Sequence, residues 1–446
     1  MQKAFKVLFV LFSLLSFHFS AAAYALQFAD ASKTVRLHWK KGKIPIAFST
    51  SLKLPNPSIL PQSDVEGALR RSLETWEQVT DIKFETIWAD KQTVSPSGIS
   101  GDGVSLITIA QTPENLLLFG NENEETSAQT RTFYNRQGFI SEADVVLNPY
   151  QQFSTDGTPG TYDLEATLTH EIGHLLGLEH SLVKGATMQA RQGKNGVFNL
   201  PAFASRTLAE DDVAGVRAIY GANNFEDECC GTVVGKIVQN KGKSIKKFQV
   251  WAEEADSGRV VGEVSTTADG SFRFEGFRAG SYRFYTQDEG QAINAGAEEL
   301  GSYDVVKDKT INITKKLRST ERNFSIQYAG FNGQLSDLAV PLNNGKSYLI
   351  YIGGKNLVVE DLEIGFNAPY FSVVLGSIKT QDYGSDVSVV SFEIQITADA
   401  PLGEYSLFVK SPNGTRHFLV GGLTIEKFVN PLNTYVLSPN NNERKY

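Results

Sequence analysis

The stretch that decides the fold of this chain runs from His170 to His180 and reads H-E-I-G-H-L-L-G-L-E-H. An α-helix repeats every ~3.6 residues, so His170 and His174 lie on the same face, about one turn apart. Gly177 ends that helix, because a residue without Cβ adopts a left-handed conformation at little cost. The turn that follows lets His180 return toward the first two histidines. The spacing therefore predicts three imidazoles around one point.

Three histidines that converge in this way are ligands of a zinc ion. They leave the fourth tetrahedral position for water, which is typical of a catalytic zinc and not of a structural one. Glu171 follows the first histidine, so its carboxylate can reach that water without being a ligand. The alternative is a buried amphipathic helix that carries histidines by coincidence. The composition argues against it, because the chain has six His, of which only His18, His38 and His417 lie elsewhere.

The motif resembles the signature of the metzincin metallopeptidases, a HExxHxxGxxH helix followed by a turn that contains methionine. Met188 falls where that Met-turn is expected, and Ser181, the residue after the third histidine, is similar to the matrixins within this clan. Residues 162–170 and 208–221 resemble the approach to the matrixin active-site helix and the last helix of the matrixin catalytic domain. The resemblance extends over roughly residues 36 to 222.

The resemblance implies a zinc-dependent endopeptidase of the extracellular space, including the extracellular matrix, that acts on proteins or peptides. It implies Glu171 as general base and Met188 as a hydrophobic floor under the histidines. It also implies that Asp211 or Asp212 tethers this floor. The expected fold is multidomain. An α+β zincin catalytic domain, with a mixed twisted sheet and three main helices, is followed by two all-β sandwich domains.

Three departures from the matrixin pattern limit what the resemblance implies. Gln189 and Ala190 follow the methionine where matrixins commonly have Tyr-Pro, so the pocket wall is not carried over. Many matrixins hold a second zinc, which we expect to be absent here because His38 is the one further histidine in that domain. No cysteine precedes the domain to act as a latch. Asp30, in the segment 26–34, is the candidate latch, and the alternative is an unlatched enzyme with a loose N-terminus.

Residues 1–25 read as a secretory signal peptide. Lys3 and Lys6 precede the apolar stretch 7–17, and Ala23-Tyr24-Ala25 is an A-x-A cleavage pattern. The alternative, a membrane anchor, needs an apolar run of ~20 residues, and this one is shorter. We therefore expect an exported, extracellular chain with no membrane span.

Composition and length limit the possible partners and the number of domains of the remaining chain. A net charge of −8 and a pI near 5.5 argue against a nucleic-acid partner, which requires basic patches. A mature chain of about 420 residues suggests roughly three domains at ~150 residues each. The predicted boundaries are 1–25 for the signal peptide, 26–225 for the metallopeptidase domain, 229–318 and 320–428 for two β domains, and 429–446 for a loose tail.

Within the first domain the sequence predicts one long helix before the zinc helix. Asp64 is its expected N-cap, and apolar residues recur at helical spacing behind it. These residues are Val65, Leu69, Leu73, Trp76 and Val79. Strands are predicted at 44–48, 82–84, 104–109, 128–135 and 144–147. Order along the chain places 129–134 at the edge of the sheet, over the cleft.

After residue 221 the pattern changes to short alternating strands with glycine-rich turns, which is typical of all-β modules. Residues 231–286 resemble the transthyretin-like (carboxypeptidase regulatory-like) sandwich, and residues 323–425 resemble an immunoglobulin-like fold. These modules are either passive spacers or binding modules for a surface, a glycan or a protein. If the second applies and the zinc site is inactive, the chain is an adhesion protein and not an enzyme.

Two further features have open interpretations. Cys229 and Cys230 are adjacent, so they form a strained vicinal disulfide, stay as free or buried thiols, or have a functional role. The acidic and glycine-rich segments 98–103 and 122–125 supply oxygen ligands for calcium or are simply solvated loops.

Overall fold

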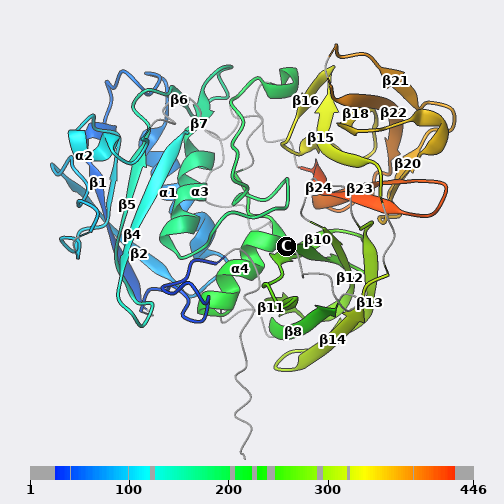
Figure 1. The fold of residues 1–446 in the computed structure, drawn as a ribbon. Coiled ribbons are helices and arrows are strands. Elements are labelled where there is room, and N and C mark those ends of the chain that lie inside the picture. Colours follow the sequence, from blue (N-terminus) through cyan, green and yellow to red (C-terminus); the bar gives the residue numbers. More distant parts are fainter. Residues whose placement is uncertain are drawn as a thin grey trace, which may run out of the picture.

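The computed structural model describes residues 26–40, 42–98, 100–120, 126–200, 206–223, 229–238, 247–288, 295–318, 322–384 and 386–426. The predicted signal peptide and the predicted tail lie outside these residues. In the part of the chain that is described, no helix is both long and apolar enough to span a bilayer. The described residues form a multidomain α+β arrangement, with α-helices in the N-terminal part and strands throughout (Figure 1).

The first domain is built on a mixed five-stranded sheet with the order β2-β1-β3-β5-β4. Its strands are β1 (Lys43–Ser49), β2 (Lys83–Ala89), β3 (Leu106–Thr108), β4 (Ala128–Tyr134) and β5 (Ile140–Leu147). All neighbours pair in parallel except β4, which is antiparallel to β5 and lies at the edge, as predicted. Strands β2 and β5 extend several residues beyond their predicted ends, whereas β3 is shorter than the predicted 104–109. β2 pairs with β1 along its whole length although most of its side chains are exposed, and β5 continues toward its N-terminus along β4.

Two helices of this domain pack on each other beside the sheet. Helix α1 (Val65–Glu77) begins at Asp64, whose side chain accepts a hydrogen bond from the N–H of Gly67. It buries its predicted apolar stripe against α3 (Leu164–Leu175), where the Trp76 indole N–H donates to the carbonyl of Thr169 at 2.9 Å. The shorter elements are α2 (Pro113–Leu116), β6 (Phe153–Ser154), β7 (Tyr162–Asp163), η1 (Thr50–Leu52) and η2 (Val197–Asn199). The last helix is α4 (Glu210–Tyr220).

The second module consists of two sheets that share one core. The sheets have the orders β10-β9-β12-β13 and β11-β8-β14. Their strands are β8 (Cys229–Val238), β9 (Phe248–Glu254), β10 (Val260–Ser265), β11 (Ser271–Arg278), β12 (Gly280–Asp288), β13 (Glu298–Val305) and β14 (Thr310–Lys316). The structure joins Cys229 to Cys230 in a disulfide, which confirms the first of the three interpretations of this pair.

The third module is a second pair of sheets packed around its own core. Strands β16-β15-β18-β22-β20 form one sheet, with β21 also paired to β22, and β17-β24-β23-β19 form the other. The strands are β15 (Ser325–Phe331), β16 (Gln334–Ser336), β17 (Val340–Leu342), β18 (Ser347–Lys355), β19 (Glu363–Phe366), β20 (Phe371–Val373), β21 (Lys379–Gln381), β22 (Ser388–Ile396), β23 (Gly403–Lys410) and β24 (Arg416–Ile425), with η3 at Val359–Asp361. Both modules are all-β, and the specific module types remain predictions.

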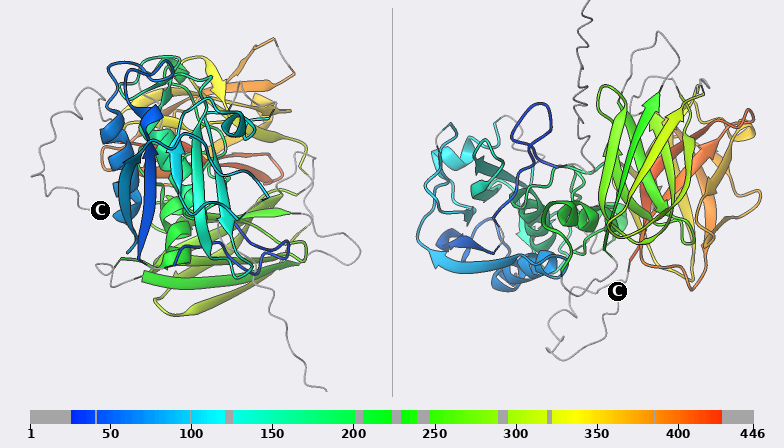
Figure 2. Two further views of the ribbon diagram at one scale, coloured as in Figure 1. Left: turned by 90° about the vertical axis from the view of Figure 1, so that its left-hand side faces the viewer. Right: turned by 90° about the horizontal axis from the view of Figure 1, so that it is seen from below.

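The three parts are packed together closely. Both β modules lie along the same flank of the first domain (Figure 2), and one continuous apolar core includes residues of the first domain and of the second module. Helix α4 lies against β10 and β11, and a Cβ on Gly276 of β11 would approach the carbonyl oxygen of Ala214 to 2.3 Å. The modules are therefore in direct contact with the helix that follows the histidine motif.

Tyr220 ties the end of α4 to the end of α3. Its hydroxyl donates to the carbonyl of Leu176 at 2.7 Å and accepts the N–H of Trp39 at 3.1 Å, and all three residues are buried. Tyr220→Phe should lower the free energy of unfolding by about 1 to 3 kcal/mol, because it leaves a buried carbonyl and a buried N–H without this partner. Urea denaturation measures the change. Tyr150→Phe, at an exposed tyrosine, is the control, and equal stability of the two variants would contradict the prediction.

Candidate active site

Helix α3 carries the motif and is fixed at both ends. At its start, the Asp163 side chain accepts the N–H of Ala166 at 2.9 Å. At its end, Gly177 has a φ of 99°, a conformation that other residues rarely adopt. A Cβ at this position would also lie 2.6 Å from the carbonyl oxygen of Leu37. Gly177 therefore permits the turn after the helix, and it also lets the N-terminal segment at Leu37 lie close to this turn.

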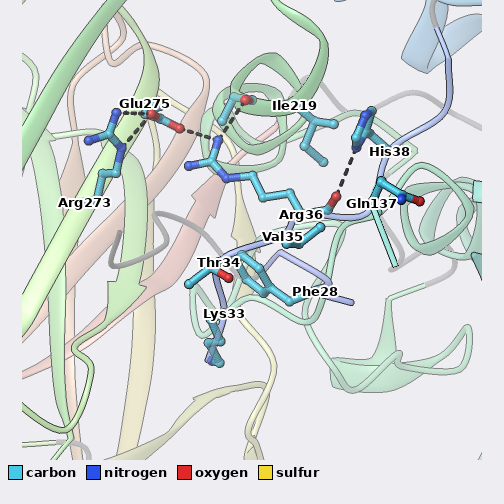
Figure 3. Close-up of a pocket in the computed structure, with 11 residues that line it drawn as sticks. Phe28, Lys33, Thr34, Val35, Arg36, His38, Gln137, Ile219, Arg273 and Glu275 are labelled. Atoms are coloured by element: carbon cyan, nitrogen blue, oxygen red, sulfur yellow. Dashed lines mark hydrogen bonds and ion pairs between the residues drawn. The ribbon is translucent and has the colours of Figure 1, made fainter. Parts of the chain in front are cut away.

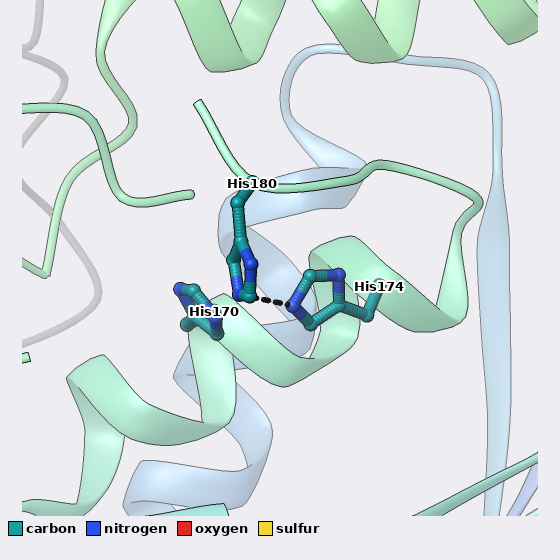
Figure 4. Close-up of side chains that lie close together, drawn as sticks. All are labelled: His170, His174 and His180. Carbon is teal, nitrogen blue, oxygen red and sulfur yellow. Dashed lines mark hydrogen bonds between the residues drawn. The ribbon is translucent and has the colours of Figure 1, made fainter. Parts of the chain in front are cut away.

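The turn brings His180 back to the two histidines of the helix (Figure 4). The centroids of the His170 and His174 rings are 4.8 Å apart, and those of His174 and His180 are 4.7 Å apart. One nitrogen from each of the three side chains lies within 4.8 Å of the other two. Among the described residues, this is the one group of His, Cys, Asp and Glu side chains that could hold a metal ion. The side chain of His180 is 43% exposed, so the group is open to solvent on that side.

Backbone carbonyls orient the two buried rings. His170 Nδ1 lies 2.7 Å from the carbonyl oxygen of Thr187, and His174 Nδ1 lies 2.8 Å from that of Leu178. An Nδ1–H that donates to a carbonyl leaves the Nε2 lone pair free to bind a metal. Burial lowers the pKa of His170 well below its usual value and that of His174 to about 4, so both rings are neutral, as metal ligands must be.

The donor set and the distance between two of its nitrogens fit a zinc ion. Two nitrogen ligands at ~2.0 to 2.1 Å from a tetrahedral zinc are about 3.3 Å apart. In the structure the Nε2 atoms of His174 and His180 are 3.1 Å apart. Burial also lowers the pKa of His180, and three neutral imidazoles are a donor set that zinc prefers. The three histidines therefore form a candidate zinc centre.

Glu171 lies beside this centre in a buried position. Its carboxylate Oε2 accepts a hydrogen bond from the Thr130 hydroxyl on β4 at 2.5 Å. Burial raises the pKa of Glu171 to about 7, because removal from water disfavours the charged form. A carboxyl group that is ionised in only part of the molecules near neutral pH is able both to accept and to release a proton.

The methionine and the aspartate pair are all buried. Met188 is buried, and its Sδ would be 2.3 Å from a Cβ placed on Gly173, so glycine leaves the room for it. The carboxylate of Asp212 accepts the N–H groups of Thr187 and Met188 at 2.8 and 3.0 Å. Of the two aspartates, Asp212 thus holds the methionine turn. Asp211 bonds elsewhere, to Ser181 and to β10 of the second module.

The structure does not bring Asp30 to the histidines. Its carboxylate accepts the N–H of Thr34 at 2.9 Å and that of Val35 at 2.7 Å, which closes a turn of the N-terminal segment. These bonds to the ionised form lower the pKa of Asp30. The candidate latch therefore has no support in the geometry. The same segment instead supports the turn after the helix, where the Gln27 N–H donates to the Gly177 carbonyl at 2.8 Å.

The candidate calcium segments are placed only in part. Residues 122–125 and residue 99 lie outside the described residues. The carboxylate of Asp102 pairs with Lys91 and accepts the N–H of Val104 at 3.1 Å. The N–H of Gly103 donates to the buried carboxylate of Glu142 at 2.5 Å. These contacts engage Asp102 and one carboxylate oxygen of Glu142, and calcium remains a prediction.

A cavity of about 550 Å³ lies between the N-terminal segment and β11, away from the zinc residues. Arg36, Arg273 and His38 line it (Figure 3). Glu275 pairs with both arginines, and Arg36 also donates to the carbonyl of Ala218 at 3.1 Å. Glu275 is the one acidic side chain among the lining residues, so it offsets only part of their positive charge, and the cavity lies between the two domains.

Sequence reasoning did not find the partners that orient the site. Thr130 is about forty positions before Glu171 on another element, and Thr187 and Leu178 contribute only backbone carbonyls. Glu263 contributes an N–H from a different module. The residue type does not reveal which backbone groups orient a site, and Thr130 lies in an ordinary strand pattern. Only the fold therefore identifies these partners.

The first domain combines a mixed sheet with two packed helices. Its three histidines lie on the second of these helices and on the turn that follows, which is the arrangement of a candidate zinc protein. The family model described as Matrixin matches residues 114–221, which include the whole centre. Residues 114–221 are therefore similar to the matrixin family. It is 29% identical over 193 residues to Metalloendoproteinase 1-MMP of Arabidopsis thaliana, covering 42% of this chain and 45% of that protein. It is 25% identical over 182 residues to interstitial collagenase of Oryctolagus cuniculus, covering 41% of this chain and 34% of that protein.

The chain thus spans less than half the length of these relatives. Among solved structures, the major pilin subunit BcpA of Bacillus cereus is similar at a TM-score of 0.18 and 12% identity, over 44% of this chain and 69% of that chain. A likeness this low carries no argument about the β modules.

Proposed function

We propose that this protein is a secreted zinc-dependent endopeptidase that hydrolyses peptide bonds of proteins. The observation that carries the proposal is the convergence of three neutral imidazoles beside the buried carboxylate of Glu171. The similarity to the matrixin family and to these relatives supports the same activity. The alternative, an inactive zinc-binding adhesion protein, gives no reason for a proton-accepting carboxylate at this place.

Each side chain of the site has a defined task in this proposal. His170, His174 and His180 hold zinc, which when bound polarises the scissile carbonyl and lowers the pKa of a water molecule to ~7. Glu171 accepts the proton of the attacking water and later delivers it to the departing amine. Thr130 keeps the Glu171 carboxylate oriented, and Met188 forms the apolar support below the histidines.

Strand β4 is the proposed docking edge for the substrate. Among the strands of the described residues, β5 is its one neighbour, and its Thr130 contacts Glu171. An extended peptide that adds to the free edge of β4, backbone to backbone, would place a peptide bond next to the histidines. Backbone pairing of this kind accepts many sequences, which suits an enzyme that cleaves proteins.

The expected result is cleavage of a mixed peptide library by the mature chain, read by mass spectrometry. Cleavage should stop when 1,10-phenanthroline removes the metal and should return when zinc is added. A preparation stripped of metal and then given magnesium is the matched control. Persistence of cleavage in excess chelator, or its absence in the zinc-loaded protein, would disprove the proposal.

A further inference from the structure

The segment between the third histidine and the methionine, residues 181–188, is called the zinc loop below. It determines the position of two of the three histidines. His180 immediately precedes it, and its Thr187 carbonyl orients His170 Nδ1 at 2.7 Å. The Ser181 N–H donates to the Met188 carbonyl at 2.7 Å and closes the loop at its base. Any shift of the zinc loop therefore shifts metal ligands.

The second module holds one side of the zinc loop through Asp211. One carboxylate oxygen of Asp211 accepts the Ser181 hydroxyl at 2.6 Å, and the other accepts the N–H of Glu263 on β10 at 2.7 Å. The N–H of Leu182 also lies 3.4 Å from the Glu263 carboxylate. These groups are buried or partly buried, so their bonds are costly to lose.

The third module holds the other side. The N–H of Lys184 donates to the carbonyl of Val420 on β24 at 3.1 Å. A Cβ on Gly185 would lie 2.4 Å from Thr424 Cγ2, so the loop passes this strand at a distance that only glycine permits. Likewise, a Cβ on Gly421 would lie 2.5 Å from Val183 Cγ1.

The two contacts meet in one apolar cluster that contains residues of all three parts. Its members are Val183 and Ala186 of the zinc loop, Ala209, Trp251, Val260 and Tyr285, and Phe408, Phe418 and Val420. The segment that follows is anchored in the same way, because Phe198 is fully buried in the core of the third module. The N–H of Phe198 donates to Gln334 Oε1 at 2.6 Å, and its carbonyl accepts from Asn332 at 2.7 Å.

We propose that the two β modules are the structural support of the zinc loop, so that zinc binding by His170, His174 and His180 depends on them. Modules that act as spacers contact their neighbour through limited polar surfaces and move relative to it. Here both modules contact the zinc loop itself, through one buried apolar cluster and through hydrogen bonds that are buried or partly buried. This role of the modules concerns the same site as the proposed function, and it rests on that site being a zinc centre.

The test uses the full mature chain with two variants that change the support and no ligand. Val420→Ala removes apolar contact at the zinc loop, and Gly185→Ala forces the loop away from β24. Val390→Ala is the matched control, because it makes the same truncation at a valine that is equally buried. Val390 belongs to the core of the third module, and no residue of the zinc loop is part of that core. Thermal unfolding identifies the variants that fold.

Zinc affinity is measured by competition with a chromophoric chelator, and coordination geometry by the visible spectrum of the cobalt(II)-loaded protein. Val420→Ala and Gly185→Ala should weaken zinc binding by ~10 to 100-fold, as loss of support for a ligand does, and change the cobalt spectrum. Val390→Ala should leave both unchanged. Unchanged affinity and spectrum in folded Val420→Ala would overturn the proposal, even if Gly185→Ala does not fold. Zinc binding by a wild-type protein that cleaves nothing would instead overturn the proposed function alone.

Discussion

Replacing Glu171 by glutamine should reduce peptide cleavage by ~100 to 10,000-fold, the usual contribution of general acid–base catalysis. Glutamine has the shape of glutamate and still accepts the Thr130 hydroxyl through its carbonyl oxygen, but it takes no proton from water. The three histidines are untouched, so the variant should bind one zinc per chain. The measurement combines kcat/KM on a peptide found in the library with the zinc content by mass spectrometry.

Glu66→Gln is the matched control for this prediction. It makes the same change of glutamate to glutamine, but Glu66 is an exposed residue in the first turn of α1 and belongs to no metal-binding group of the described residues. It should retain near wild-type activity. Activity of Glu171→Gln close to that of Glu66→Gln would show that Glu171 is not the base.

His174→Ala should abolish both zinc binding and cleavage. His174 is the central member of the group, because its Nε2 lies 3.1 Å from that of His180 and its ring is edge-on to that of His170 at 4.8 Å. Removing a ligand should weaken zinc binding by more than the ~10 to 100-fold that loss of a supporting hydrogen bond costs. Chelator competition measures the affinity, and the peptide assay measures the activity.

His38→Ala serves as the control for histidine removal in the same domain. His38 packs on Phe139 with ring centroids 4.6 Å apart and belongs to no metal-binding group of the described residues. Its loss should leave zinc content and cleavage unchanged. Equal zinc affinity of His174→Ala and wild type would contradict the assignment of the centre.

Local pattern was sufficient for much of the first domain. The apolar stripe of α1 follows from helical spacing, and Asp64 caps the helix as its position before Val65 predicts. Strand β4 lies at the edge where chain order placed it. The pattern did not predict the full length of β2, and it did not show where the Asp30 carboxylate bonds. Asp30 is the one acidic residue before the first strand, but local N–H groups satisfy its carboxylate, and such bonds are invisible in a linear comparison.

The sequence alone determined the chemistry of the centre, because His170, His174, Gly177 and His180 are placed by the fixed geometry of one helix and one turn. It could not determine what holds that geometry. The carbonyls that orient the rings, the Thr130 hydroxyl and the Asp211 link to Glu263 come from elements far apart in the chain. Backbone N–H and C=O groups are the same in nearly every residue, so the sequence does not mark the ones that orient the site. Packing between modules depends on which surfaces meet in the folded chain. Only the tertiary structure could therefore place the β modules against the zinc loop.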